Sequence, residues 1–262
     1  MKKKIAIIGA GNIGLAIAEG VTKSGIAEKV FITRKNKGFS EILNQDYECL
    51  GNKDAVLNAD IIILAVQPTQ IDELLQEIKN YVKKGQLIIS VVSGISIERI
   101  EKLIEISGIH VARAMPNTGI RYGQSMTCLS FNEQSLKLKE IVQSIFGSLG
   151  KTLIIPESNF PEATVLCGSG IALVLRFIRA YMQAGIQSGF NEHDALLIAT
   201  QVMIGAASLC EKGSHPEMEI DKVTTPRGIT IETLIEMERA GFSSALNSGI
   251  KVGVSKAKSL YE

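Results

Sequence analysis

The stretch Lys4-Ile-Ala-Ile-Ile-Gly9-Ala-Gly-Asn-Ile-Gly14 decides the fold of this chain. A short apolar run, typical of a strand buried on both faces of a parallel sheet, leads directly into the pattern Gly-x-Gly-x-x-Gly. An amphipathic helix is expected over Ile13–Ser24, because apolar residues recur there at intervals of three and four. In this context Gly9 permits a tight turn, Gly11 lets the backbone approach a pyrophosphate, and Gly14 lets helix and strand pack closely. The stretch predicts a dinucleotide-binding turn rather than a glycine-rich turn without a ligand.

The first half of the chain alternates short β-branched runs with segments of helical period. The predicted strands are Lys4–Ile8, Val30–Thr33, Ile61–Val66, Leu87–Val92, Val111–Ala114, Met126–Ser130 and Leu153–Ile155. The predicted helices between them are Ile13–Ser24, Ile71–Val82, Ile97–Ser107 and Ser135–Leu149. Strands separated by crossover helices indicate an α/β fold with a doubly wound, mostly parallel sheet.

After residue 156 the pattern changes to helical segments without a convincing strand. We therefore expect two domains, residues 1–156 and residues 157–262, the second of them all-α. The segment Thr164–Gln183 is apolar nearly all round its helical circumference. Such a helix must be enclosed, either in a large core or in a subunit interface.

Composition excludes several classes of protein. The 262 residues are 45% hydrophobic and 21% charged with a net charge of +1, so neither nucleic acid nor an acidic membrane surface is indicated as a partner. The four cysteines and three histidines are dispersed without metal-ligand spacing. The apolar stretch Ala163–Leu175 is shorter than a membrane span. We expect a soluble, cytoplasmic protein without a metal site, its cysteines reduced.

The end of the second predicted strand bears on the choice of cofactor. A site that prefers NAD places an acidic residue there to accept a hydrogen bond from the ribose 2′-hydroxyl. This chain reads Phe31-Ile-Thr-Arg-Lys35, without an acid. Arg34 and Lys35 suit a 2′-phosphate instead, which favours NADPH over the alternative of a solvated basic turn.

Several segments resemble the pyrroline-5-carboxylate reductase family, and the likeness extends over nearly the whole chain. They are Ala59-Asp-Ile-Ile-Ile-Leu-Ala-Val-Gln-Pro68, Ser90-Val-Val-Ser-Gly-Ile95, Arg113-Ala-Met-Pro-Asn-Thr118, Cys167-Gly-Ser-Gly170, Asp221-Lys-Val-Thr-Thr-Pro-Arg-Gly-Ile-Thr230 and Arg239-Ala-Gly-Phe242. The segment ending at Thr230, with the one that follows it, is the most specific.

The resemblance implies an N-terminal Rossmann domain that binds NADPH and an all-α C-terminal domain that forms an intertwined homodimer. It implies reduction of 1-pyrroline-5-carboxylate to proline, the last step of proline biosynthesis. Carried over by motif, the cofactor contacts are Ile8, Gly9, Ala10, Gly11, Asn12, Ile13, Gly14, Arg34, Lys35, Asn52, Ala65, Val66, Gln67 and Pro68. The substrate contacts are Glu157, Thr225, Gly228, Ile229 and Thr230.

Reduction of a cyclic imine needs hydride at the ring carbon and a proton or positive charge on the nitrogen. A hydroxyl that hydrogen-bonds this nitrogen would orient the substrate, and the family pattern offers Thr230 as the catalytic residue. From position alone, Thr230 is also a good helix N-cap. Glu157 is likewise open to a second interpretation, as a first-turn acid favoured by the helix dipole.

The chain departs from the family pattern at Gln67, Gly119, Ile171, Leu173 and Arg227. Two other functions therefore stay open: an NADPH-dependent reductase of another imine or a keto or hydroxy acid, and a catalytically idle NADP-binding regulator. Hydroxyacid dehydrogenases of this layout carry a catalytic lysine after the first domain. Residues 161–188 contain no lysine, which disfavours that class.

Overall fold

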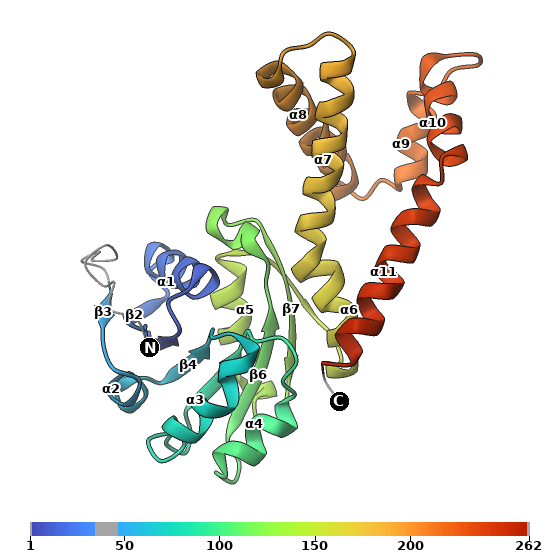
Figure 1. Ribbon diagram of the computed structural model, residues 1–262. Helices are drawn as coiled ribbons and strands as arrows, with labels where there is room; N and C mark the ends of the chain where they lie inside the picture. The colour runs from blue at the N-terminus through green and yellow to red at the C-terminus, as the bar shows by residue number, and fades with distance from the viewer. Residues whose placement is uncertain (1, 35–46, 261–262) are drawn as a thin grey trace. The chain divides into compact units, whose positions relative to one another are not determined.

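A computed structural model describes residues 2–34 and 47–260 of the chain. It divides into two compact units, which we name by their content. The sheet unit comprises Met1–Ile171 with Val254–Glu262, and the helical unit comprises Ala172–Gly253. Figure 1 shows the elements of both units.

The sheet unit contains an eight-stranded sheet in the order β3-β2-β1-β4-β5-β6-β7-β8. All neighbouring strands are parallel except β6 and β7, which confirms the predicted mostly parallel sheet. Every predicted strand is present, and the short β3 was not predicted. The strands are β1 (Lys3–Ile8), β2 (Ala27–Thr33), β3 (Glu48–Cys49), β4 (Ile61–Leu64), β5 (Leu87–Ser90), β6 (His110–Met115), β7 (Ser125–Phe131) and β8 (Gly150–Ile154).

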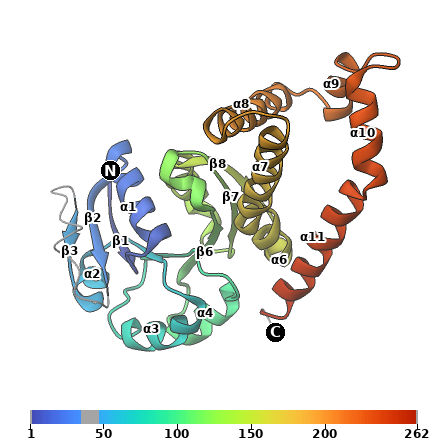
Figure 2. The same ribbon diagram turned by 45° about the horizontal axis from the view of Figure 1, so that its top comes forward.

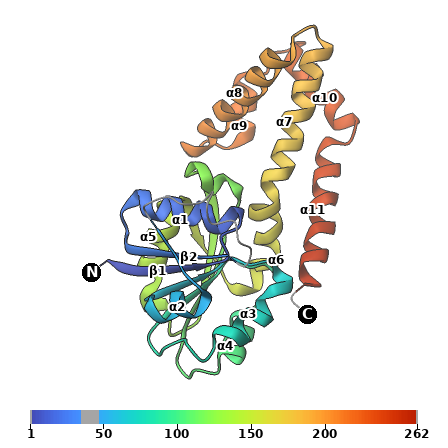
Figure 3. The same cartoon turned by 60° about the vertical axis from the view of Figure 1, so that its left-hand side comes forward.

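Helices cover both faces of this sheet (Figure 3). On one face α1 (Asn12–Ser24) and α5 (Lys139–Gly147) pack against the strands, and on the other α2 (Asn52–Asn58), α3 (Ile71–Ile78) and α4 (Ile97–Ile104) do so. Because both faces are covered, β4 and β5 are buried at every residue, as their unbroken apolar sequences require. Helix α4 ends earlier than predicted, since Glu105 adopts a left-handed conformation with φ of 60°.

The expected domain boundary after residue 156 falls inside the sheet unit. The short helix α6 (Phe160–Ala163) and a π-helical segment, Thr164–Ser169, follow β8 and remain with the sheet. Phe160 is fully buried in a cluster with Met115 and Cys128, which holds these turns against β6 and β7. The last residues of the chain return to this unit, where Lys258 pairs with Glu162 at 3.0 Å. The boundary between the two units therefore depends on how these residues pack, and not on the point in the chain where strands give way to helices.

The helical unit is all-α, as expected. It is built from α7 (Gly170–Gln187), α8 (Glu192–Glu211), α9 (Pro216–Lys222), α10 (Ile229–Arg239) and α11 (Phe242–Lys258), of which α7 and α11 continue into the sheet unit. Helices α7 and α8 lie side by side around a small cluster of Met182, Ala195 and Ala199 (Figure 2). Phe177 packs edge-to-face on Phe242, with ring centroids 5.7 Å apart.

Most large apolar side chains of α7 and α8 are exposed within the single chain. The predicted enclosure of Thr164–Gln183 is therefore not provided by a core of this chain. The exposed residues on these two helices are Leu173, Val174, Leu175, Tyr181, Ile186, Leu196, Leu197, Ile198, Val202, Ile204 and Leu209. By length and composition alone, the helical stretches Glu157–Gln187 and Glu192–Glu211 could cross a membrane. The apolar segment Ala163–Leu175, expected to be too short for a membrane span, lies within the first of these longer stretches, so the expectation that the chain has no membrane partner stays a prediction.

Candidate cofactor site

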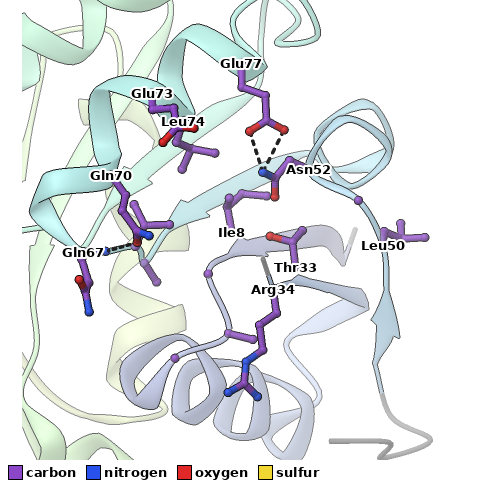
Figure 4. A pocket seen from close by; sticks show the side chains of 16 residues that line it. Ile8, Thr33, Arg34, Leu50, Asn52, Gln67, Gln70, Glu73, Leu74 and Glu77 are labelled. Atoms are coloured by element: carbon purple, nitrogen blue, oxygen red, sulfur yellow. Dashed lines mark hydrogen bonds between the residues drawn. The ribbon is translucent and has the colours of Figure 1, made fainter. Parts of the chain in front are cut away.

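A cleft of about 540 Å³ lies in the sheet unit where β1, β2 and β4 end (Figure 4). The strand order reverses between β1 and β4, and in open α/β sheets ligands bind in such a crevice at the carboxyl ends of the strands. The residues that line it are Ile8, Gly9, Ala10, Gly11, Thr33, Arg34, Leu50, Gly51, Asn52, Ala65, Val66, Gln67, Gln70, Glu73, Leu74 and Glu77.

A distinct steric reason accounts for glycine at each of the three positions of the turn. Gly9 has φ of 105°, and a Cβ placed on it would lie 2.8 Å from the carbonyl oxygen of Ala65. A Cβ on Gly14 would collide with the carbonyl oxygen of Gly9. A Cβ on Gly11 would meet no protein atom within 4 Å, so this position faces open space in the cleft. The backbone thus leaves room at Gly11 for a group as large as a pyrophosphate to approach, as predicted.

The turn is held in place by its neighbours and ends in a helix that suits an anion. The Thr33 carbonyl at the end of β2 accepts hydrogen bonds from the backbone N–H groups of Gly9 at 3.2 Å and Ala10 at 2.8 Å. Helix α1 begins after Gly11, and its first turn contains no acidic residue. Its free N–H groups and positive dipole end are therefore not opposed by a negative charge in the first turn of the helix itself.

Arg34 lies at the rim of this cleft, immediately after β2, and its side chain is exposed. In Figure 4 its guanidinium lies away from Glu73 and Glu77, the two acidic residues on the α3 side of the cleft. An exposed cation at the end of the second strand is where a 2′-phosphate would be met. Lys35, predicted to share this role, lies outside the described residues.

Asn52, at the start of α2, is oriented by Glu77. Its Nδ2 group donates to both carboxylate oxygens of Glu77 at 3.1 Å (Figure 4). Because an ionised carboxylate only accepts hydrogen bonds, the amide nitrogen of Asn52 must face Glu77. The amide oxygen then remains as the acceptor that Asn52 offers to a ligand in the cleft.

The loop after β4 forms the next part of the cleft wall. Ala65 donates its backbone N–H to Ile8 at 2.9 Å, which ties the loop to β1. The backbone N–H of Gln67 donates to Gln70 Oε1 at 3.3 Å and so fixes the turn that leads into α3. Ala65, Val66 and Gln67 line the cleft.

Most predicted cofactor residues that the structure describes line one cleft. Four do not contribute to the lining: Asn12, Ile13 and Gly14, which form the first turn of α1, and Pro68, which lies in the turn before α3. Sequence reasoning missed further lining residues: Thr33, Leu50, Gly51, Gln70, Glu73, Leu74 and Glu77. Their chain positions were the available signal for two of them, since Thr33 directly precedes Arg34 and Gly51 directly precedes Asn52. The α3 residues reach the cleft through tertiary packing that no local pattern reveals.

Glu157, predicted to contact substrate, has structural partners. Its Oε1 accepts from the backbone N–H of Ile97 at 2.7 Å and from Arg113 Nη1 at 3.1 Å. The Arg113 side chain is 1% exposed and stacks on the Phe160 ring, 4.0 Å from its centroid. Glu157 therefore joins the first turn of α4 to β6, and a substrate contact for it stays a prediction. The sequence contained one signal for this ion pair, namely Arg113 inside a buried strand, because a buried charge needs a partner.

The other predicted substrate residues form a tight loop in the helical unit. Gly228 donates its N–H to the Thr225 carbonyl at 2.9 Å, and a Cβ on Gly228 would collide with the Thr225 side chain. Gly228 is the N-cap of α10, so the interpretation of Thr230 as N-cap is wrong. Thr230 instead belongs to the first turn of α10. In the described part of the chain its hydroxyl has no hydrogen-bond partner.

Arg227 precedes this N-cap in an unusual conformation. Its φ is 57°, in the left-handed region, and its side chain is exposed. The resemblance places a glycine at this position, and a glycine adopts this conformation without steric cost. The departure at Arg227 therefore adds backbone strain as well as a cation to the loop.

Comparisons with known proteins match both halves of the chain. Residues 4–94 match a family model described as NADP oxidoreductase, coenzyme F420-dependent, and residues 157–260 match one described as pyrroline-5-carboxylate reductase dimerisation. Pyrroline-5-carboxylate reductase 2 of Dictyostelium discoideum is 38% identical over 97% of this chain and 92% of its own length. Pyrroline-5-carboxylate reductase 1 of the same organism is 44% identical over 98% of this chain, which spans 50% of that longer protein.

A solved structure shows the same architecture throughout. The crystal structure of Plasmodium falciparum pyrroline carboxylate reductase with NADP bound superposes with a TM-score of 0.90 and is 26% identical in sequence. The match covers 99% of this chain and 98% of the other.

Proposed function

Because the chain belongs to the pyrroline-5-carboxylate reductase family, we propose that it reduces 1-pyrroline-5-carboxylate to proline with NADPH, the last step of proline biosynthesis. The observation that carries the proposal is the pairing of two features in one chain. A glycine-rich cleft with room for a pyrophosphate is followed by a domain that matches the reductase family over residues 157–260.

The cleft supports a division of labour in cofactor binding. The backbone around Gly11 and the first turn of α1 would hold the pyrophosphate, and Arg34 would bind the 2′-phosphate. The amide oxygen of Asn52 would accept a hydrogen bond from the nucleoside. Glu77 acts through Asn52 as a positioning residue. The loop Ala65–Gln67 would confine the cofactor on the β4 side. NADPH, when bound, supplies the hydride that the imine carbon accepts.

The loop before α10 supports a second set of roles. The backbone N–H groups of Ile229, Thr230 and Ile231 open the helix and would bind the substrate carboxylate. The Thr230 hydroxyl would hydrogen-bond the imine nitrogen, orient the ring and relay a proton to it as the amine forms. No strong general acid is required, because the imine is able to enter protonated. The hydroxyl is available for this role, since Thr230 does not cap its own helix.

The proposal includes a homodimer formed by the helical unit. The match of residues 157–260 to a dimerisation domain supports it, as do the exposed apolar side chains of α7 and α8. Surfaces of this kind on soluble proteins mark interfaces. A second copy of the chain would cover these side chains and so provide the enclosure that the apolar segment Thr164–Gln183 requires. We propose the cytoplasm as the location, because all four cysteines are free thiols.

The decisive experiment follows NADPH oxidation by the purified full chain with 1-pyrroline-5-carboxylate beside a panel of other cyclic imines and 2-keto acids. We expect the highest kcat/KM with 1-pyrroline-5-carboxylate, and proline as the product. A higher value with another imine or a keto acid would reassign the substrate. NADPH binding without turnover of any compound would indicate a regulator.

A further inference from the structure

Two cysteines from separate elements meet in the sheet unit. Cys128 lies on β7 and is buried, whereas Cys167 lies in the π-helical segment Thr164–Ser169 and is partly exposed. Their Sγ atoms are 3.4 Å apart, although 39 residues separate them in sequence. The remaining cysteines, Cys49 on β3 and Cys210 on α8, belong to other parts of the chain.

The contact gives the two thiols different chemical character. A hydrogen bond from the Cys128 thiol lowers the pKa of Cys167 to about 7. The same hydrogen bond, together with burial, raises the pKa of Cys128. Cys167 is thus the more acidic thiol of the pair and also the more exposed one, and thiolates rather than thiols attack electrophiles. Cys128 keeps its proton and lies in contact behind it.

The local backbone places this pair beside the carboxyl edge of the sheet. A Cβ on Gly168 would lie 3.6 Å from the sulfur of Met115, the last residue of β6. π-Helical turns are rare and occur frequently at functional sites. The resemblance places a serine where this chain has Cys167, so the general reductase reaction does not require a thiol there.

We propose that Cys128 and Cys167 form a peroxide-reactive dithiol, a modification site that closes reversibly to an intramolecular disulfide. The Cys167 thiolate attacks one oxygen of hydrogen peroxide, the O–O bond breaks, and hydroxide leaves to give a sulfenic acid at Cys167. The Cys128 sulfur then attacks the Cys167 sulfur, the S–O bond breaks, and water leaves with the Cys128 proton. Two thiols are oxidised by two electrons, and the peroxide is reduced.

The geometry requires little movement for closure. A disulfide needs an S–S distance of about 2.05 Å, so the two sulfur atoms, which are 3.4 Å apart, must approach each other by about 1.35 Å. Cys167 is the less buried of the two residues, so a small peroxide should reach its sulfur first, while burial of Cys128 directs its reaction to Cys167 rather than to another molecule.

The test treats the reduced full-length protein with hydrogen peroxide, alkylates the remaining thiols under denaturing conditions and maps peptides without reduction. We expect the wild type to lose two of its four alkylatable thiols and to yield a Cys128–Cys167 linked peptide. Dithiothreitol should restore both thiols. A Cys49→Ser/Cys210→Ser double variant keeps only the pair and should form the same link, whereas Cys167→Ser should form none.

Cys128→Ala tests the order of the two steps. In this variant the oxidation should stop at a sulfenic acid on Cys167 that dimedone traps. If Cys128→Ala is unstable because residue 128 is buried, the proposal is decided by the other two variants. The linked peptide should then form in the Cys49→Ser/Cys210→Ser variant and not in Cys167→Ser. Absence of the linked peptide, equal oxidation of Cys210, or over-oxidation of Cys167 beside a free Cys128 would overturn the proposal.

Discussion

The sheet unit and the helical unit both contain long apolar segments, but only the first buries them within one chain. In the sheet unit every residue of β4 and β5 is buried between two layers of helices. In the helical unit only Ala195 and Ala199 are buried on the whole of α8. The difference shows that an apolar pattern predicts that a surface will be covered, but not whether this chain or another copy covers it.

The same contrast holds for the two predicted sites. The cofactor cleft is assembled from several loops of the sheet unit, whose strands fix the distances between them. The substrate loop ending at Thr230 belongs to the helical unit and is largely exposed when that unit is considered by itself. Substitutions in the two units should therefore affect separate properties, namely cofactor binding in the first and turnover in the second.

The largest effect is expected for Gly11→Ala. The added methyl group meets no protein atom within 4 Å, so the melting temperature should be unchanged, but the group projects into the space for the pyrophosphate. Loss of two charge-assisted phosphate contacts at about 1.5–3 kcal/mol each should weaken NADPH binding by at least about a hundredfold. Calorimetric titration measures this, with Gly147→Ala on α5 as a control of equal steric freedom. Unaltered affinity in Gly11→Ala would show that the cleft does not bind the pyrophosphate here.

The second effect concerns turnover. If Thr230 orients the imine nitrogen, Thr230→Ala should lower kcat by roughly tenfold to a hundredfold or more and leave NADPH affinity unchanged. Thr230→Ser should retain activity. Thr233→Ala, one turn further along α10, is the control, because the Thr233 hydroxyl bonds only its own helix at Ile229. A normal kcat in Thr230→Ala would remove Thr230 from the mechanism.

The third effect concerns cofactor selectivity. Arg34→Ala should reduce NADPH affinity by roughly tenfold to a hundredfold, since one charge-assisted phosphate contact contributes about 1.5–3 kcal/mol. NADH affinity should not change, because NADH lacks the 2′-phosphate. Titration of both cofactors with wild type and variant separates these outcomes. An equal loss for both cofactors would mean that Arg34 acts on something other than the 2′-phosphate.

The smallest effect is expected for Arg227→Gly. Relief of the left-handed conformation should raise the free energy of unfolding by up to about 1 kcal/mol, as measured by chemical denaturation. Because the side chain is exposed, KM should stay unchanged. Glu105→Gly, at the other non-glycine residue described with positive φ, is the matched control in the sheet unit. A higher KM with weaker salt dependence in Arg227→Gly would instead place this cation beside the substrate carboxylate.

Local patterns were sufficient for the features that a short stretch of chain determines. The roles of Gly9, Gly11 and Gly14 follow from one turn, and the buried strands follow from their composition. Features that join distant segments could not be predicted. Glu77 orients Asn52 from another helix, Glu157 reaches Arg113 across 44 residues, and Cys167 meets Cys128 across 39. Residue types alone do not show which of many possible partners will be adjacent.

The N-cap at Gly228 shows that the ends of elements are also hard to predict from sequence. A threonine before a helical pattern is a good cap by propensity, but here the loop closes two residues earlier, at the hydrogen bond from Gly228 to Thr225. The expected domain boundary after residue 156 coincides with the start of the dimerisation family match at residue 157, but the division into compact units falls later in the chain. The helical pattern after residue 156 is real, yet Phe160 packs into the sheet unit and keeps the first turns there.

Sedimentation velocity of the full chain without detergent, over a range down to low nanomolar concentration, tests the contrast between the two units most directly. If a second copy covers the apolar faces of α7 and α8, the smallest folded species should have twice the 28.3 kDa mass of one chain or a multiple of it. Dissociation should coincide with loss of helical circular dichroism. A folded, soluble monomer of 28.3 kDa would contradict the account.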